Sequence, residues 1–306
     1  MTESNGNSRS KLHGLWALTN RELKKWYKAP VIFILSIIQP IIWMGLLGKA
    51  MNISAIFSSG SFGQLLENLV LTPPLTATQS LQLGVFFQGL QNSIMLNTFN
   101  TTDYFSFMAV GMIAFTALFT TAFSGMSVVW DRRLGFLNKA LSTPVSRAVI
   151  VFSKVLAATL RSMFQAGIII LIAVAFGLQF GASFNPVFVL GVFGIMFLIC
   201  VGLSSMFIAI TIRSTRMETP MAVMNLITLP LMFASNAFFP TSIMPSWLQT
   251  VATFNPMTYT TDAVRQLLIN ETTDFMVVAK DFAYVGIFAV VAATIGIVLS
   301  WRFLNK

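Results

Sequence analysis

The side chains that most often carry catalysis or bind metal ions are scarce in this sequence. It contains one histidine, His13, and one cysteine, Cys200, which excludes a histidine cluster, an intrachain disulfide and a cysteine-based metal site. The phosphate-binding pattern G-x-x-x-x-G-K followed by serine or threonine is also missing, because Gly48-Lys49-Ala50 lacks the earlier glycine and the hydroxyl. A serine–histidine–aspartate triad has no credible histidine. We therefore expect no catalytic residue, no bound metal and no cofactor in this chain.

Charged residues gather in the segment 130–147, WDRRLGFLNKALSTPVSR, which separates two long apolar runs, 104–129 and 148–176. It is too polar for hydrocarbon and too short for a domain. Asp131 is expected to be the N-cap of a short helix, and leucines spaced three and four apart give that helix an apolar face. Thr143-Pro144 is expected to end the helix. The pattern predicts a helix outside the bilayer that passes force from a soluble partner into two membrane helices, with an ordinary basic cytoplasmic loop as the alternative.

Three polar features outside that segment are also candidates. Asp262 and Arg265 are three residues apart, which suits an ion pair on one helical face, either a latch on an exterior gate or an ordinary surface pair. Asn255-Pro256 is expected to start the helix that carries them, since proline suits a first helical turn. Arg161 lies in an apolar run, where a charge at the bilayer centre would cost about 2.5–3.5 kcal/mol. We expect Arg161 near the cytoplasmic end, snorkelling or facing protein, with a role in the transport path as the alternative.

The composition is that of a membrane protein that crosses the bilayer several times. Hydrophobic residues make up 56% of the 306 residues and charged residues only 9%, against roughly 25% charged residues in a soluble protein. The net charge is +9, but the basic residues flank apolar runs and do not form one polar domain, which argues against a nucleic-acid partner. The N-terminus lacks the apolar core of a cleaved signal peptide.

Apolar runs of about 20 residues predict six membrane-spanning helices, and hence an all-α polytopic membrane protein. Pro40 and Pro230 should kink the first and the fifth of these helices. Residues 240–275 are interrupted by prolines and are expected to form two short exterior helices that dip into the membrane before the last span. The spans are expected at about 31–50, 104–129, 150–176, 187–212, 221–239 and 280–300.

The first 28 residues are expected to lie outside the spans, as a polar lead-in and an amphipathic helix, while residues 29–306 would form the transmembrane domain. Residues 12–28 combine an apolar face rich in aromatic side chains with a charged face, which is typical of a helix lying in the membrane interface. The candidate residues of this interfacial helix are Trp16, Arg21, Glu22, Lys25 and Trp26.

The distribution of basic residues predicts the orientation of the spans. With Arg161 set aside, 15 lysines and arginines flank one side of the predicted membrane and 3 the other, so both termini are expected in the cytoplasm of a cell-membrane protein. Three sequons, at Asn52, Asn100 and Asn270, fall on the predicted exterior, whether or not they are glycosylated. The exterior connection 51–103 is weakly polar, and a short amphipathic helix is expected at 62–71.

The segment 130–147 resembles the cytoplasmic coupling helix of the type-2 ABC exporter permeases, the family that includes the daunorubicin-resistance-type exporters. The matching residues are WDRRLGFL from Trp130 and PVSR from Pro144, and Lys154 follows as in the family. A second block, 245–268, is similar to the family's exterior segment with its Asn-Pro and Asp-x-x-Arg elements. One departure is Arg133, which stands where the family commonly has an acidic residue. If that position pairs with a basic residue of the ATPase, the pair must be rebuilt here.

The resemblance implies the permease subunit of an ATP-driven exporter for a lipophilic or amphiphilic, drug- or lipid-like substrate. A separately encoded ABC ATP-binding subunit would hold ATP and Mg²⁺, and a second copy of this chain or a close homologue would complete the path, surrounded by membrane lipid. The contact with the ATP-binding subunit would be made mainly by Asp131, Arg132, Arg133, Leu134, Gly135, Phe136, Leu137, Lys139 and Leu141. The exterior gate would comprise Asn255, Pro256, Asp262 and Arg265.

Two other classes of function are consistent with the same segment. A membrane scaffold that does not transport could anchor a soluble partner through it. An ion-coupled secondary carrier would need carboxylates inside the membrane, and we expect none in the spans, which disfavours this class.

Overall fold

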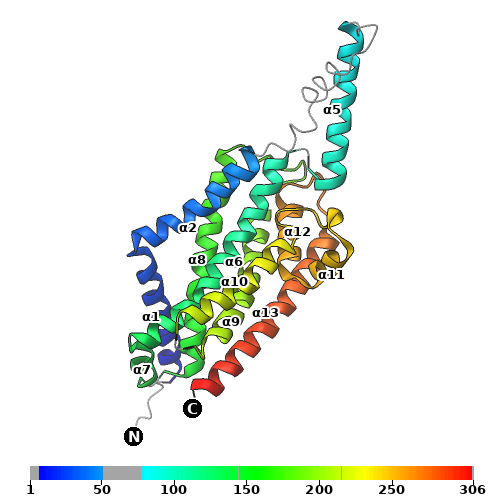
Figure 1. The fold of residues 1–306 in the computed structure, drawn as a ribbon. Coiled ribbons are helices and arrows are strands. Elements are labelled where there is room, and N and C mark those ends of the chain that lie inside the picture. The colour runs from blue at the N-terminus through cyan, green and yellow to red at the C-terminus, as the bar shows by residue number, and fades with distance from the viewer. Residues whose placement is uncertain (1–6, 51–76, 102, 144, 215, 305–306) are drawn as a thin grey trace.

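The computed structural model describes residues 7–50, 77–101, 103–143, 145–214 and 216–304, and within these ranges it contains helices and no strand (Figure 1). The predicted all-α fold is confirmed. The first half of the chain contains α1 (Asn7–Tyr27), α2 (Pro30–Trp43), the π-helical η1 (Met44–Ala50), α5 (Ala77–Phe99), α6 (Tyr104–Arg133) and α7 (Phe136–Leu141). The second half contains α8 (Arg147–Ala175), α9 (Phe188–Thr211), α10 (Glu218–Phe233), the 3₁₀-helical η2 (Thr241–Ile243), α11 (Ser246–Phe254), α12 (Pro256–Leu268) and α13 (Phe275–Leu304).

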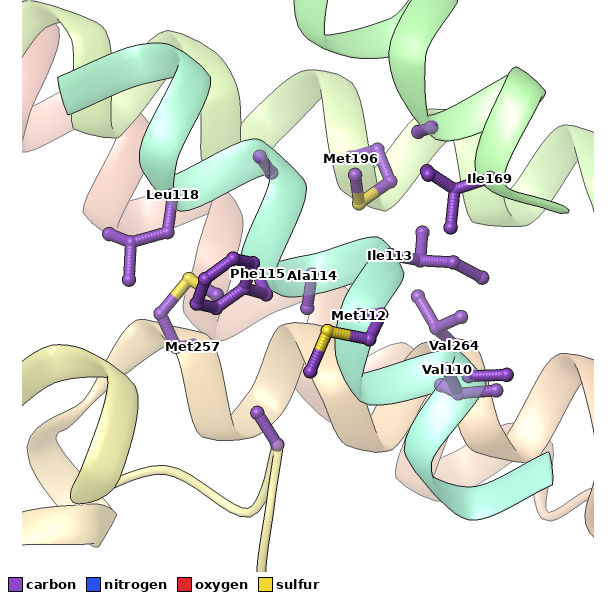
Figure 2. Packing of buried hydrophobic residues seen from close by; sticks show 14 of the residues in the cluster. Val110, Met112, Ile113, Ala114, Phe115, Leu118, Ile169, Met196, Met257 and Val264 are labelled. Carbon is purple, nitrogen blue, oxygen red and sulfur yellow. The ribbon is translucent and has the colours of Figure 1, made fainter. Parts of the chain in front are cut away.

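Helix α6 is the centre of the bundle and packs against α8, α9, α10 and α12. Every residue from Tyr104 to Leu118 is buried, which is the pattern of a helix enclosed on all sides. Figure 2 shows side chains that meet in this core, among them Ile113 of α6, Ile169 of α8, Met196 of α9 and Met257 of α12. The core therefore joins α6 to α8, α9 and α12.

Local sequence explains where α6 starts and how closely it packs. The carboxylate of Asp103 accepts two backbone N–H groups of the first turn, at 3.0 and 3.3 Å, and so caps the helix. A Cβ atom on Gly111 would lie 2.0 Å from the carbonyl oxygen of Ala237, and one on Gly125 would lie 2.9 Å from the carbonyl oxygen of Phe207. Small residues permit such backbone contacts where helices pack in membranes.

Four stretches of the described residues are long and apolar enough to cross a membrane, and they contain α6, α8, α9 and α13. The stretch Phe33–Lys49 is apolar but shorter, and α10 has 16 residues. Pro40 and Pro230 lie inside α2 and α10, as the sequence predicts. A multi-pass membrane architecture is thus confirmed, whereas the number of six spans stays a prediction.

The connection 51–103 contains a long helix that the sequence patterns did not predict. Helix α5 has 23 residues and projects beyond the rest of the bundle (Figure 1). Leu81 and Val85 are each 71% exposed, so its apolar residues do not form one packed face. A helix without a distinct apolar face gives little periodic signal. The helix predicted at 62–71 lies outside the described residues.

The two short helices predicted before the last span are present as α11 and α12. Helix α12 packs against α9 and α13, and both short helices lie away from the end of the bundle that holds the chain termini (Figure 1). Their depth in the membrane stays a prediction.

Candidate functional site

The segment between α6 and α8 lies at the end of the bundle where both chain termini lie (Figure 1). Helix α6 continues beyond the apolar run to Arg133, and a turn at Gly135, with φ of +71°, leads into α7. Glycine adopts this left-handed conformation without steric cost. The predicted N-cap role of Asp131 is wrong, because Asp131 lies in the last turn of α6 and α7 starts at Phe136. The sequence pattern placed the end of the preceding helix where polarity changes, near Trp130, but the helical hydrogen bonds of α6 continue to Arg133.

Asp131 is instead the centre of a charge cluster formed by Arg21, Glu22, Lys25, Asp131 and Lys154. Its carboxylate binds the ammonium groups of Lys154 and Lys25 at 2.5 and 2.7 Å, and the guanidinium of Arg21 at 3.4 Å. Glu22 binds the same three cations at distances from 3.1 to 3.4 Å. Asp131 is 1% exposed, and Glu22 and Lys154 are each 5% exposed. The cluster therefore joins α1, α6 and α8 through buried ionic groups that depend on one another.

Phe136 connects α7 to the charge cluster. Cζ of Arg21 lies 3.1 Å from the centre of its ring and Nζ of Lys25 lies 5.6 Å away, both within cation–π range. On the inner side of α7, Leu137 and Ala140 are buried in a small apolar cluster with residues of α6, α8 and α9. Helix α7 is thus held by α1 through Phe136 and by the bundle through apolar packing.

The residues predicted to contact an ATP-binding subunit divide into supporting and exposed ones. Asp131 and Leu137 are buried, and Phe136 and Leu141 are half-buried, so these four hold α7 in place. Arg132 is half-buried and donates from Nη1 to the carbonyl oxygen of Ser214 at 3.5 Å. The supporting group therefore includes five of the nine residues that were predicted to contact the ATP-binding subunit: Asp131, Arg132, Phe136, Leu137 and Leu141.

The exposed group is Arg133, Leu134, Gly135 and Lys139. Leu134 is 74% exposed, so its predicted place on a common apolar face with Leu137 and Leu141 is wrong. The turn at Gly135 separates it from α7 and breaks the helical spacing. These four residues form the outer surface of the segment, which we call the docking surface.

Helix α1 is the predicted interfacial helix, but its inner face is partly polar. Glu22, predicted on the charged face of this helix, is buried, and Thr19 donates to the carbonyl oxygen of Ser153 at 3.4 Å. Trp16 is 59% exposed, whereas Trp26 packs edge-on against aromatic rings of α2 and α8. In the sequence, Lys154 is the residue that could have indicated the charge cluster, because a lysine within an apolar run needs a carboxylate partner when it is buried. The membrane location of α1 stays a prediction.

At the other end of the bundle, Asn255 joins two helices, and its predicted role at the start of α12 is confirmed. Its Oδ1 accepts the N–H of Met257 at 3.0 Å, which caps α12, and Pro256 occupies the first turn. Its Nδ2 donates to the carbonyl oxygens of Leu231 and Ala234 at 2.8 and 3.0 Å. These carbonyls end α10, so one side chain satisfies both helix termini.

We predict that Asn255→Ala destabilises the protein by about 2–3 kcal/mol, because it removes a cap and leaves two carbonyl oxygens without their donor. Asn255→Ser is the matched control, since its neutral hydroxyl keeps a cap acceptor but is too short to replace the amide donor to both carbonyl oxygens, and it should cost less. Thermal unfolding of the detergent-solubilised protein measures both changes. Equal losses for the two variants would contradict the dual role of Asn255.

The predicted Asp262–Arg265 ion pair is wrong. Among the described residues, all the ion pairs belong to the charge cluster at the opposite end. Arg265 is 4% exposed, donates from Nη2 to the carbonyl oxygen of Ala237 at 3.2 Å and places Cζ 3.6 Å from the ring centre of Phe107. The guanidinium is directed at a carbonyl and a ring on distant segments, so Arg265 fixes α12 against α6. A gating role for this region stays a proposal.

The expectation that the spans contain no carboxylate is wrong for Asp281. Asp281 falls within the predicted span 280–300 itself, and it lies inside α13 (Phe275–Leu304), where it is only 4% exposed. Its Oδ2 has no hydrogen-bond partner among the described residues. The argument against ion coupling from missing carboxylates is therefore weaker than the sequence indicated.

Comparison with known proteins bears on most of the chain. Residues 13–269 match the family model described as ABC-2 type transporter. A protein of Cyanophora paradoxa named transport permease ycf38 is 28% identical over 254 residues, which cover 83% of this chain and 73% of that protein. The daunorubicin resistance ABC transporter permease protein DrrB1 of Streptomyces coeruleorubidus is 24% identical over 172 residues, 55% of this chain and 59% of that one. The multidrug ABC transporter permease YbhR of Escherichia coli strain K12 is 26% identical over 182 residues, 58% of this chain and 48% of that one.

Proposed function

The chain belongs to the ABC-2 type transporter family and is a membrane permease subunit of an ABC transporter, and from this premise we propose that it exports a lipophilic or amphiphilic compound across the cell membrane. ATP and Mg²⁺ would be bound on a separate ATP-binding subunit. The substrate class is supported by two relatives, one named for daunorubicin resistance and one named as a multidrug permease. The observation that carries the proposed mechanism is the charge cluster, because it joins α1, α6 and α8, and its cations Arg21 and Lys25 also contact Phe136 of α7.

The first step of the proposed mechanism is docking of the ATP-binding subunit at the docking surface. Arg133 and Lys139 provide positive charge, and the exposed Leu134 provides apolar contact. A groove with acidic residues around an apolar pocket would complement this surface. Charge complementarity of this kind selects the partner and the register of docking.

The second step is the transfer of movement from α7 into the bundle. Helix α7 follows α6 after one tight turn, and the charge cluster fastens α1 and α8 to the same place. Separation of buried ionic partners is costly, so α1, α6, α7 and α8 would move as one body. Closure of the ATP-binding subunits would then tilt these helices.

The transport path would lie between two permease chains, this one and a second copy or a close homologue. Exposed apolar residues on α2 and α10, such as Val31 and Leu226 at 67% and 72%, are available to lipid or to the second chain. We propose that both termini are cytoplasmic, in line with the distribution of basic residues. A membrane scaffold that binds a soluble partner without transport is the alternative.

The proposal is tested with the permease co-expressed with an ABC ATP-binding subunit and reconstituted in inside-out vesicles. We expect ATP-dependent, vanadate-sensitive uptake of a lipophilic probe such as daunorubicin, and higher ATPase activity in its presence. Binding of the ATP-binding subunit without ATP-dependent uptake of any lipophilic probe would favour the scaffold.

A further inference from the structure

A cavity of about 280 Å³ lies between α2, α6 and α8, and the ring of Trp26 from α1 forms part of its wall. Most of its lining is apolar and includes Phe115, Phe119 and Phe123. Arg161 also lines it. The volume is close to the lower limit of about 300 Å³ for small-molecule sites. The cavity could hold a polar head with the start of an apolar body, but no bulky compound.

Arg161 is the charged group of this cavity, and it has no ion-pair partner among the described residues. Its Nε donates to the carbonyl oxygen of Ala157 at 3.3 Å, and no hydrogen bond of its Nη groups occurs in the same part of the chain. Glu22, which acts on it electrostatically, is already bound by the three cations of the charge cluster. The cavity thus contains a positive charge that a ligand can neutralise.

Two cations are buried among the described residues, Lys154 and Arg265, whereas Arg161 is half-buried. Both buried cations have partners within the protein, although Nε of Arg265 has no hydrogen bond there. Lys154 has two carboxylates, and Arg265 has a carbonyl oxygen and an aromatic ring. Arg161 lines an apolar cavity, and its Nη groups have no hydrogen bond among the described residues. An unneutralised charge inside the membrane is costly, so an anionic occupant would be bound strongly there.

The shape of the cavity is fixed by a chain of polar contacts across its wall. Gln165 on α8 accepts from Thr120 on α6 and donates to Ser36 on α2, both at 2.5 Å. Ser36 in turn donates to the carbonyl oxygen of Phe33 at 2.7 Å. These groups are occupied with one another, so they hold three helices at fixed positions and leave the guanidinium as the main anchor for an acidic group.

The cavity also has a defined apolar exit. Phe123 and Leu35, which line it, are 57% and 59% exposed on the surface of the bundle. A chain attached to a head at Arg161 could therefore continue along α2 and α6 into the surrounding lipid. An acidic group at one end and an extended apolar body match both parts of this geometry.

We propose that this cavity binds the acidic head of a single-chain amphiphile, with its carboxylate, phosphate or sulfonate on Arg161 and its apolar body against the phenylalanines of α6. If the bound amphiphile is the transported substrate, this proposal rests on the proposed function and narrows the exported substrates to acidic amphiphiles. Where the occupant is a membrane lipid, it fills the same site as a resident. Both sources share one recognition chemistry, a charge-assisted hydrogen bond to a guanidinium.

The test uses the purified full-length chain in a non-ionic detergent without ATP, with 12-bromododecanesulfonate and its neutral match 12-bromododecanol as probes. Bromine quenches tryptophan fluorescence on contact, and Trp26 lines the cavity. We expect saturable quenching with an apparent Kd about tenfold lower for the sulfonate than for the alcohol, as a charged hydrogen bond implies. Arg161→Met should abolish this preference and leave the weaker quenching by the alcohol unchanged. Trp26→Phe should remove the saturable component.

Equal affinities of the wild-type protein for the two probes would overturn the proposal without reference to any variant. The proposal would also be overturned if the sulfonate quenched the tryptophan fluorescence of the Trp26→Phe variant as strongly as that of the wild type, because the probe would then bind elsewhere. Native mass spectrometry distinguishes the sources: an acidic phospholipid retained by the wild type and lost from Arg161→Met identifies a resident lipid. Sulfonate binding without a retained lipid identifies a free amphiphile. These measurements need no partner, so failure of ATP-dependent transport would contradict the proposed function alone.

Discussion

Replacement of Lys154 with methionine is expected to destabilise the protein by about 3–5 kcal/mol, the cost of leaving buried charges unpaired. Lys154 is 5% exposed and binds the carboxylates of both Asp131 and Glu22. Methionine fills a similar volume, so the loss would come from charge and not from a cavity. Thermal unfolding of the detergent-solubilised chain, followed by loss of monodispersity on size exclusion, measures the change.

The matched control is Lys25→Met, which removes another cation of the same cluster. Lys25 is 43% exposed, so solvent screens its interaction and the change should cost only about 0–1 kcal/mol. A double variant, Lys154→Met with Asp131→Asn, should lose less than the sum of the two single variants, because the two residues interact directly. If Lys154→Met is no more harmful than Lys25→Met, the cluster does not hold α1, α6 and α8 together.

The double charge reversal Arg133→Glu with Lys139→Glu is expected to reduce ATP-dependent transport at least tenfold while the permease still folds and inserts. Both side chains are exposed, so they contribute little to the stability of this chain. Against a partner that complements the docking surface, reversal would create like-charge contacts that cost several kcal/mol. The measurements are uptake into inside-out vesicles and retention of the ATP-binding subunit during purification.

Arg302→Glu serves as the control for this reversal, because Arg302 is an exposed basic residue at the same end of the bundle but away from α7. It should leave transport and retention unchanged. Leu134→Asp offers a second test of the docking surface that does not change a basic residue. Undiminished transport by the double reversal and by Leu134→Asp would contradict docking at this surface.

Local patterns in the sequence predicted the elements that depend on local physics. The apolar runs placed α8, α9 and α13 within a few residues of their observed positions, because long apolar helices need little beyond length and composition. Asn255-Pro256 predicted the start of α12 because a cap is a contact within one turn. The end of α6 was missed because polarity changes at Trp130 while the helix continues.

The interactions that build the candidate site could not be predicted from spacing. Glu22 and Lys154 are 132 residues apart in the chain, and Lys25 and Asp131 are 106 apart. Arg265 shows the same limit, because spacing indicated Asp262 while the guanidinium binds Ala237 and Phe107. A charged residue in an apolar run signals that a partner exists, but only the fold determines which one.

The length of α6 has a mechanical consequence. Its 30 residues form one uninterrupted rod of about 45 Å. Asp131 lies near one tip, and Phe107, whose ring contacts the guanidinium of Arg265, lies near the other. A rod that pivots within a tightly filled bundle swings its two tips in opposite directions. A displacement of the docking surface would therefore move the Arg265 contact directly, without passing through loops. One helix would couple movement at one membrane face to movement at the other.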